Sequence, residues 1–183
     1  MKVFSALGSP NKKGNTAALL NEYLKGVNEN HENVENTSVF LQEKDIKACR
    51  GCNACKNGLG NCVIKDDMQQ LYKEIKEADI IIFATPVYWW NMTAQLKTFI
   101  DRMYALDFEK VFLGKKFTLL MTYGGANPNS GAMIVKKNLE EIVSFLGMDF
   151  VHKYGVSTGD YREYPVDKNI EALSDVYNLG KAL

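Results

Sequence analysis

Residues 79–103, DIIIFATPVYWWNMTAQLKTFIDRM, decide the fold. The segment opens with an apolar, β-branched run, which is typical of a parallel strand covered on both faces. After a short loop, apolar side chains recur at the spacing of one helical face. The segment therefore predicts a buried strand, a loop and a helix in that order, which is the repeating unit of a parallel α/β sheet.

The same alternation extends in both directions along the chain. Further apolar runs predict strands at residues 3–7, 34–41, 117–122 and 150–156. The remaining helices are expected around residues 17–27, 68–78 and 135–146, and from Pro165 onward. Asp66 and Asp67 stand where the helix at 68–78 needs an N-cap. Five strands alternating with five helices predict one α/β domain over residues 1–183, a three-layer, doubly wound parallel sheet.

Composition narrows the possible partners of this domain. With 183 residues, 46% of them hydrophobic, the chain can bury a full core without disulfides. Its 22 basic and 22 acidic residues balance, so no overall field attracts nucleic acid or an anionic membrane. The sequence contains no apolar run of membrane-spanning length and no secretory signal pattern. We expect a cytoplasmic protein that binds small molecules.

In a doubly wound sheet, ligands bind outside the carboxyl ends of the strands, where the strand order reverses. The loop after the first strand, GSPNKKGNTA at 8–17, offers Ser9, Asn11, Asn15 and Thr16 as polar groups. The free N–H groups of a helix N-terminus follow them and favour an anion such as phosphate. An ordinary capped turn is the alternative, because Ser, Asn and Gly are common turn residues.

The glycine spacing of this loop excludes two kinds of phosphate site. Gly8 and Gly14 are one residue too far apart for a P-loop, and Asn15 stands where that motif has its lysine. The G-x-G-x-x-G fingerprint of dinucleotide sites is also missing. The loop therefore fits a single terminal monophosphate, such as that of FMN.

The loop after the third predicted strand places Tyr88, Trp89 and Trp90 beside a strand end. Planar side chains suit a flat heteroaromatic ligand, and the backbone of residues 87–92 could hydrogen-bond its edge. The alternative is packing into the core or against another subunit, and we expect it for at least one of the tryptophans.

The loop after the fourth strand, TYGGANPNSG at 122–131, supplies the hydroxyl of Thr122 and the ring of Tyr123. Gly124 and Gly125 permit a close approach of the backbone to a ligand. Three loops at one sheet edge could therefore hold a phosphate and both edges of a ring.

All four cysteines fall within CRGCNACKNGLGNC at 49–62, as Cys49, Cys52, Cys55 and Cys62. Thiolates select zinc and iron-sulfur clusters, and three cysteines at two-residue gaps favour the cluster over zinc. Only part of the ferredoxin pattern is met, because the fourth cysteine lies farther off and is not followed by proline. Zinc and free, redox-active thiols stay open as alternatives, whereas a disulfide framework is the least favoured in the cytosol. Turns at Gly51, Gly58 and Gly60 could let the thiols converge.

Four segments together resemble the flavodoxin-like NAD(P)H-dependent FMN reductase family, in particular its iron-sulfur flavoprotein branch. They are GSPNKKGNT (8–16), CRGCNACKNGLGNCVIKDDM (49–68), TPVYWWNMTAQLKTFIDR (85–102) and TYGG (122–125). The resemblance runs from the first strand to about Gly131. It implies the flavodoxin-like strand order 2-1-3-4-5, with non-covalent FMN between strands one and three.

The resemblance also implies roles for particular residues. The phosphate of FMN would be held by Ser9, Asn11, Asn15, Thr16 and Ala17. The isoalloxazine would be held by Pro86, Val87, Tyr88, Trp89, Asn91, Thr122, Tyr123, Gly124 and Gly125. Cys49, Cys52, Cys55 and Cys62 would ligate a [4Fe-4S] cluster.

The function implied is electron transfer through FMN. The donor would be NAD(P)H or a ferredoxin-like carrier, and the acceptor a quinone, a nitroaromatic, a ferric species or a protein. Catalysis would be mostly positioning, without an acid or base side chain, in a homodimer or homotetramer. One alternative is a flavodoxin-like carrier without its own substrate, although such carriers tend to be strongly acidic and this chain is neutral. Another is a zinc-binding or thiol-based redox sensor.

Overall fold

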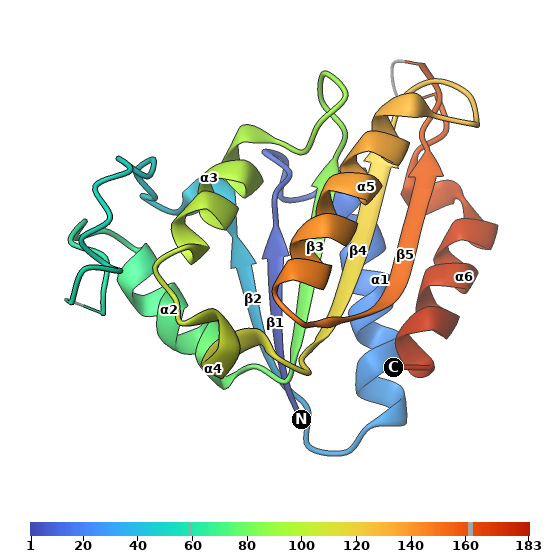
Figure 1. Cartoon of the computed structure of the whole chain (residues 1–183). Helices are drawn as coiled ribbons and strands as arrows, with labels where there is room; N and C mark the ends of the chain where they lie inside the picture. Colours follow the sequence, from blue (N-terminus) through green and yellow to red (C-terminus); the bar gives the residue numbers. More distant parts are fainter. Residues whose placement is uncertain (59, 161–162) are drawn as a thin grey trace.

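The computed structural model describes residues 1–58, 60–160 and 163–183, and its centre is one parallel sheet. The strand order is β2-β1-β3-β4-β5 (Figure 1), as predicted. The strands are β1 (Lys2–Leu7), β2 (Glu35–Phe40), β3 (Ile80–Pro86), β4 (Lys116–Tyr123) and β5 (Asp149–Ser157). Each lies within one residue of its predicted bounds at either end.

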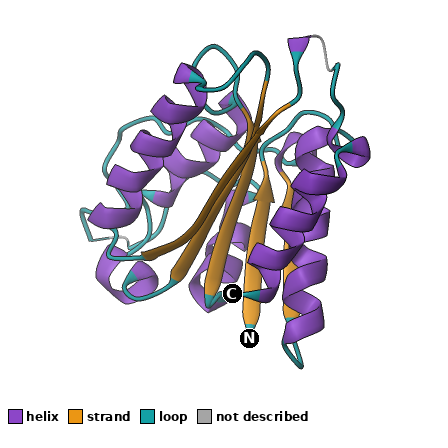
Figure 2. Cartoon of the chain, turned by 90° about the vertical axis from the view of Figure 1, so that its right-hand side faces the viewer, coloured by secondary structure: helices purple, strands orange, loops and turns teal. Residues whose placement is uncertain are grey.

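Helices cover both faces of the sheet, which gives the three layers seen in Figure 2. The helices are α1 (Asn15–Asn30), α2 (Met68–Glu77), α3 (Ala94–Met103), α4 (Phe108–Phe112), α5 (Ser130–Phe145) and α6 (Ile170–Lys181). Two short 3₁₀ turns lie in the connections: η1 (Leu41–Glu43) follows β2, and η3 (Val166–Lys168) precedes α6. Helices α1 and α6 pack on one face, and α2, α3, α4 and α5 on the other. Among the described residues, no helix combines the length and apolar content needed to cross a bilayer.

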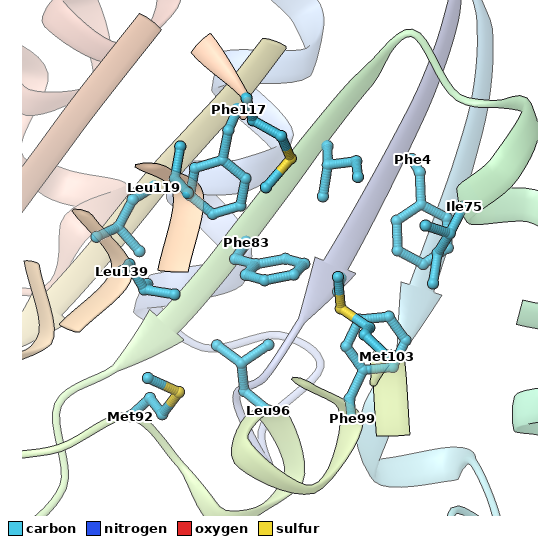
Figure 3. Packing of buried hydrophobic residues seen from close by; sticks show 14 of the residues in the cluster. Phe4, Ile75, Phe83, Met92, Leu96, Phe99, Met103, Phe117, Leu119 and Leu139 are labelled. Atoms are coloured by element: carbon cyan, nitrogen blue, oxygen red, sulfur yellow. The ribbon is translucent and has the colours of Figure 1, made fainter. Parts of the chain in front are cut away.

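Strand β3 shows why the apolar run at 79–85 forms the centre of the sheet. Its alternate side chains enter two different hydrophobic clusters, Ile81 and Phe83 on one face and Ile80, Ile82 and Ala84 on the other. Figure 3 shows the first of these clusters, in which the ring of Phe83 makes edge contacts with two other rings. The centroid distances are 5.9 Å to Phe99 of α3 and 5.0 Å to Phe117 of β4. A continuous apolar run is needed because both faces of this strand are buried.

On the other face, α1 and α6 cross with their backbones in contact. A Cβ atom added to Gly26 would lie 2.1 Å from the carbonyl oxygen of Tyr177, and one added to Gly180 would lie 2.1 Å from that of Tyr23. The amide of Asn30 also donates to the carbonyl of Lys181 at 2.8 Å. Two glycines therefore set the distance between these helices.

The C-terminal helix begins at Ile170, and its predicted start at Pro165 is wrong. Pro165 is extended, with φ −66° and ψ 139°, and precedes η3. The helix starts after Asn169, whose side chain accepts the N–H of Ala172 at 3.0 Å. An asparagine that caps a helix end outweighs the preference of proline for the first helical turn.

The N-terminus of α2 differs from expectation in one respect. Asp67 is its N-cap, but the Asp67 side chain makes no capping hydrogen bond. The carboxylate of Asp66 accepts the N–H of Met68 instead, at 3.2 Å. Helix α4 was not predicted, because five residues are too few to display a helical period.

Candidate functional site

A cleft opens at the carboxyl edge of the sheet, where the loops after β1, β3 and β4 meet. Its volume of about 470 Å³ lies within the usual range for small-molecule sites. The expected cofactor residues that line it are Ser9, Asn11, Asn15, Thr16, Pro86, Val87, Tyr88, Thr122, Tyr123 and Gly124. Segments distant in sequence therefore converge here, as the topology of a doubly wound sheet requires.

Four expected residues, Ala17, Trp89, Asn91 and Gly125, do not belong to this lining. Ala17 is 3% exposed and packs into the core, so its part in an anion site would be its backbone N–H. The side chain of Asn91 accepts the N–H of Met92 at 2.8 Å. The carbonyl of Gly125 accepts a hydrogen bond from the hydroxyl of Ser157. The cofactor roles of these four residues stay predictions, as do those of the ten that line the cleft.

The end of the cleft at the start of α1 is suited to an anion. The N-cap of α1 is Gly14, which has no side chain to bond the N–H groups of the first turn. These groups have no acceptor within the helix, and the helix dipole places partial positive charge at the same point. Ser9 and Asn11 shape the adjoining loop, since Ser9 Oγ accepts the N–H of Asn11 at 3.1 Å. Lys13 also lines this end of the cleft.

A buried pair of hydroxyls joins the first and third loops. Thr16 Oγ1 and Thr122 Oγ1 are 2.6 Å apart, and the two residues are 2% and 3% exposed. Only one of the two hydroxyls donates in this contact, so the other keeps its hydrogen for a ligand. Asn15 connects the start of α1 to the segment before α6, because its Oδ1 accepts the N–H of Val166 at 3.0 Å. The side chains expected to hold the phosphate thus also hold the cleft together.

The loop after β3 forms a two-residue hairpin that projects beyond the sheet (Figure 1). Tyr88 and Asn91 exchange backbone hydrogen bonds of 2.8 and 3.0 Å. Trp89 and Trp90 at its tip have φ values of 47° and 59°. Positive φ at both central residues is the geometry of a type I′ turn, a strained one for bulky side chains.

The turn directs both indoles outward, with Trp89 90% and Trp90 55% exposed. The expectation that a tryptophan packs into the core is therefore wrong, and only its alternative, a contact with another subunit, stays a prediction. Trp90 Nε1 donates to the hydroxyl of Ser130 at 2.9 Å, which links the hairpin to the start of α5. Tyr88, 47% exposed, is the aromatic residue of the hairpin that lines the cleft.

Sequence reasoning missed several residues of the cleft, namely Lys13, Gly14, Ala18, Thr158, Gly159, Pro165 and Asp167. Thr158 and Gly159 follow β5, and Thr158 donates its N–H to the carbonyl of Tyr123 at 2.8 Å. Turn residues directly after a predicted strand were a usable signal for this pair. Pro165 and Asp167 lie in the connection to α6, and no motif in the sequence marks them.

The four cysteines are free thiols that line a single cavity of about 50 Å³ beside α3. Cys49 and Cys52 are exposed, whereas Cys55 and Cys62 are partly buried. The loop reaches this shape through left-handed backbone conformations at Gly51 (φ 64°), Asn53 (53°), Gly58 (93°) and Gly60 (63°). Three of these are the glycines at which turns were expected.

The chemistry of this donor set fits an iron-sulfur cluster, because clusters are held by thiolates and four thiols open onto one cavity. Within residues 1–58, 60–160 and 163–183, no group of three Cys, His, Asp or Glu side chains is arranged to hold a single metal ion. The thiols therefore share a cavity without forming a closed metal centre.

Beneath the cysteine loop lies a buried ion pair, Arg102 of α3 with Asp66. The guanidinium donates to the two carboxylate oxygens at 2.5 and 3.1 Å, and their side chains are 1% and 0% exposed. Burial alone would raise the pKa of Asp66, but the hydrogen bonds from Arg102 and from the N–H of Lys47 outweigh it and lower that pKa. Nη2 of Arg102 also lies 3.4 Å from Cys62 Sγ. Sequence reasoning assigned this arginine no role.

Comparison with known proteins places the chain in a protein family. The family described as NADPH-dependent FMN reductase matches residues 1–162. An iron-sulfur flavoprotein of Archaeoglobus fulgidus is 40% identical over 125 residues, which cover 68% of this chain and 56% of that protein. The chain thus spans little more than half the length of this relative. An iron-sulfur flavoprotein of Methanosarcina thermophila is 30% identical over 190 residues, covering 100% of this chain and 93% of the relative.

Solved structures show the same architecture at lower identity. The NAD(P)H:quinone oxidoreductase from Methanothermobacter marburgensis superposes with a TM-score of 0.74 and 16% identity, covering 99% of this chain and 94% of the other. At that identity the likeness concerns the fold. The family match extends over most of the sequence, from β1 to beyond the end of β5. This chain is therefore a member of the NADPH-dependent FMN reductase family.

Proposed function

We propose that this protein is an FMN-dependent oxidoreductase. The observation that carries the proposal is the convergence of three strand-end loops on one cleft, with the uncapped N-terminus of α1 at its end. The N–H groups of that helix and the side chains of Ser9, Asn11 and Thr16 would bind the phosphate of FMN. Tyr88 and the backbone after β3 and β4 would bind the ring.

The chain's own contribution would be binding and orientation. Bound FMN would supply the hydride and electron chemistry. The cleft offers planar and backbone groups, so catalysis would rest on stacking a nicotinamide or an acceptor against the ring. NAD(P)H or a low-potential carrier would be the donor, and a quinone, a nitroaromatic, a ferric species or a protein the acceptor. The family favours an enzyme over an electron carrier without a substrate.

We further propose that Cys49, Cys52, Cys55 and Cys62 hold a [4Fe-4S] cluster. Support comes from the cavity that the four thiols share and from relatives that are named iron-sulfur flavoproteins. Such a cluster would exchange single electrons and so link a two-electron donor to one-electron acceptors. We also propose a homodimer or homotetramer, in which the exposed hairpin would contact another subunit.

One anaerobic experiment tests both parts of this proposal. Protein purified without oxygen and supplied with FMN should show flavin absorption, bound iron and sulfide, and turnover of NADH or NADPH with a quinone acceptor. Absence of flavin absorption would refute the FMN site. Flavin binding without turnover of any acceptor would instead indicate a carrier, and stoichiometric zinc without iron would indicate a zinc protein.

Replacing Thr16 with valine should weaken FMN binding by about 1 to 3 kcal/mol, because a buried hydroxyl would lose its bond to the phosphate. Quenching of FMN fluorescence measures the dissociation constant. The control is Thr118→Val, since Thr118 is a buried threonine of β4 that bonds the hydroxyl of Tyr23 at 3.0 Å and lies outside the cleft. Equal affinity in the Thr16→Val variant and the wild type would assign the phosphate to other groups.

A further inference from the structure

Arg102 lines the cavity that contains the four cysteines. It comes from the last turn of α3, and the residue is 2% exposed. A guanidinium stays charged at any pH that a folded protein meets, so this cavity has a fixed positive charge in its wall. The other charged residues of the wall, Arg50 and Asp101, are exposed, and the rest of the wall consists of the four thiols and of uncharged residues.

The hydrogen bonds of Arg102 divide into two groups. One group fixes the side chain in place: the bidentate contact with Asp66, and a bond from Nη1 to the carbonyl of Lys47 at 2.7 Å. The second group is a single contact with sulfur, in which Nη2 donates to Cys62 Sγ at 3.4 Å. Asp66 therefore orients the guanidinium, and the guanidinium reaches a thiol.

One donor of Arg102 is left over. Its Nε is buried and has no hydrogen-bond partner among the residues that the structure describes. A buried N–H without an acceptor is unfavourable, so this donor is free to bond a group that the described residues do not supply. A purely structural ion pair would account for the contact with Asp66, but it explains neither this free donor nor the contact with sulfur.

We propose that Arg102 is a tuning residue for a cluster bound by the cysteines, donating a charge-assisted hydrogen bond to the sulfur of Cys62 and supplying a fixed positive charge in the wall of their cavity. This inference rests on the cluster proposed above. Reduction adds one electron, and hence one negative charge, to a cluster. A cation that donates hydrogen bonds to the sulfurs stabilises that charge and raises the reduction potential. Arg102 acts through hydrogen bonds and does not itself exchange electrons.

The test is the midpoint potential of the cluster in reconstituted protein. Dithionite is the reductant, redox mediators equilibrate the sample, and visible absorption reports the reduced fraction. Arg102→Gln removes the charge but leaves Asp66 buried without its partner, which endangers folding. The double variant Arg102→Gln with Asp66→Asn removes both charges and keeps polar groups in both places. Arg102→Gln should make the potential more negative by at least about 59 mV, which is tenfold in the equilibrium constant for one electron. The double variant should shift the potential in the same direction by less, because the loss of the Asp66 anion offsets part of the loss of the cation.

Lys56→Gln is the matched control. Lys56 is a cation of the same loop, but its Nζ bonds the carbonyl of Leu106 at 2.8 Å and lies over the ring of Phe108 at 4.1 Å. Its removal should leave the potential unchanged. An equal shift in Lys56→Gln and in the double variant would overturn the inference, because general charge would then explain it.

Two other outcomes separate this inference from the cluster proposal. Iron bound as in the wild type, with an unchanged potential in the double variant, would overturn the role of Arg102 and leave the cluster intact. Wild-type protein that takes up no iron would overturn the cluster, and the inference with it. A double variant that folds and binds FMN but takes up no iron would also overturn it, since Arg102 would then hold the cluster and not tune it.

Discussion

Replacing Cys55 with serine should abolish iron binding and leave the affinity for FMN unchanged. A serine hydroxyl is a far poorer ligand for iron than a thiolate, and the three remaining thiols would leave one iron of the cluster without its protein ligand. FMN binding is expected to persist because the cysteine cavity and the cleft have no lining residue in common. Iron and sulfide analysis after anaerobic reconstitution measures the first effect, and quenching of FMN fluorescence measures the second.

Asn57→Ser is the control for this variant. Asn57 is an exposed residue of the same loop, with no thiol, and its backbone N–H bonds the carbonyl of Asn53 at 3.0 Å. The control should bind iron as the wild type does. Equal iron content in Cys55→Ser and the wild type would remove Cys55 from the ligand set.

Replacing Gly26 with alanine should lower the free energy of unfolding by about 3 kcal/mol. The new Cβ would lie 2.1 Å from the carbonyl oxygen of Tyr177, far inside van der Waals contact, so α6 would have to move away from α1. The obstacle is backbone, which cannot rotate aside as a side chain can. Guanidinium denaturation followed by circular dichroism measures the change.

The sign of this effect makes the test decisive. Helix propensity alone predicts that alanine stabilises a helix interior relative to glycine by about 1 kcal/mol. Asn21→Ala, at an exposed position of the same helix, should show a smaller gain in propensity, up to about 0.7 kcal/mol, without the steric cost. A Gly26→Ala variant as stable as the wild type would mean that the two helices can separate freely.

The sequence predicted the sheet well for a physical reason. A strand buried on both faces has to be apolar throughout, so the run at 79–85 marked β3 almost to the residue. The helices between the strands have one apolar face each and were equally visible. Their ends were less so, because Pro165 and Asn169 both carry helix-start signals and only tertiary context selects between them.

The candidate site was predictable only where its residues follow strands. Ser9, Thr16 and Thr122 were found because loops at the carboxyl edge of a parallel sheet must meet. Arg102 was not found, since its partner Asp66 is 36 positions away and a charged residue at the end of an amphipathic helix is ordinarily solvated. The outward direction of the two indoles was also hidden, because it follows from positive φ at Trp89 and Trp90.

The type I′ hairpin has a consequence for spectroscopy. The chain contains two tryptophans, and both stand at the tip of this hairpin beside the cleft. Indole emission from this protein therefore originates at the rim of the cleft and from no other part of the chain. Because Trp89 is 90% and Trp90 55% exposed, unfolding changes the surroundings of these rings less than it would for buried indoles, whereas a chromophore in the neighbouring cleft that absorbs at their emission wavelength would quench them. Intrinsic fluorescence is thus a reporter of site occupancy here and a poor reporter of folding.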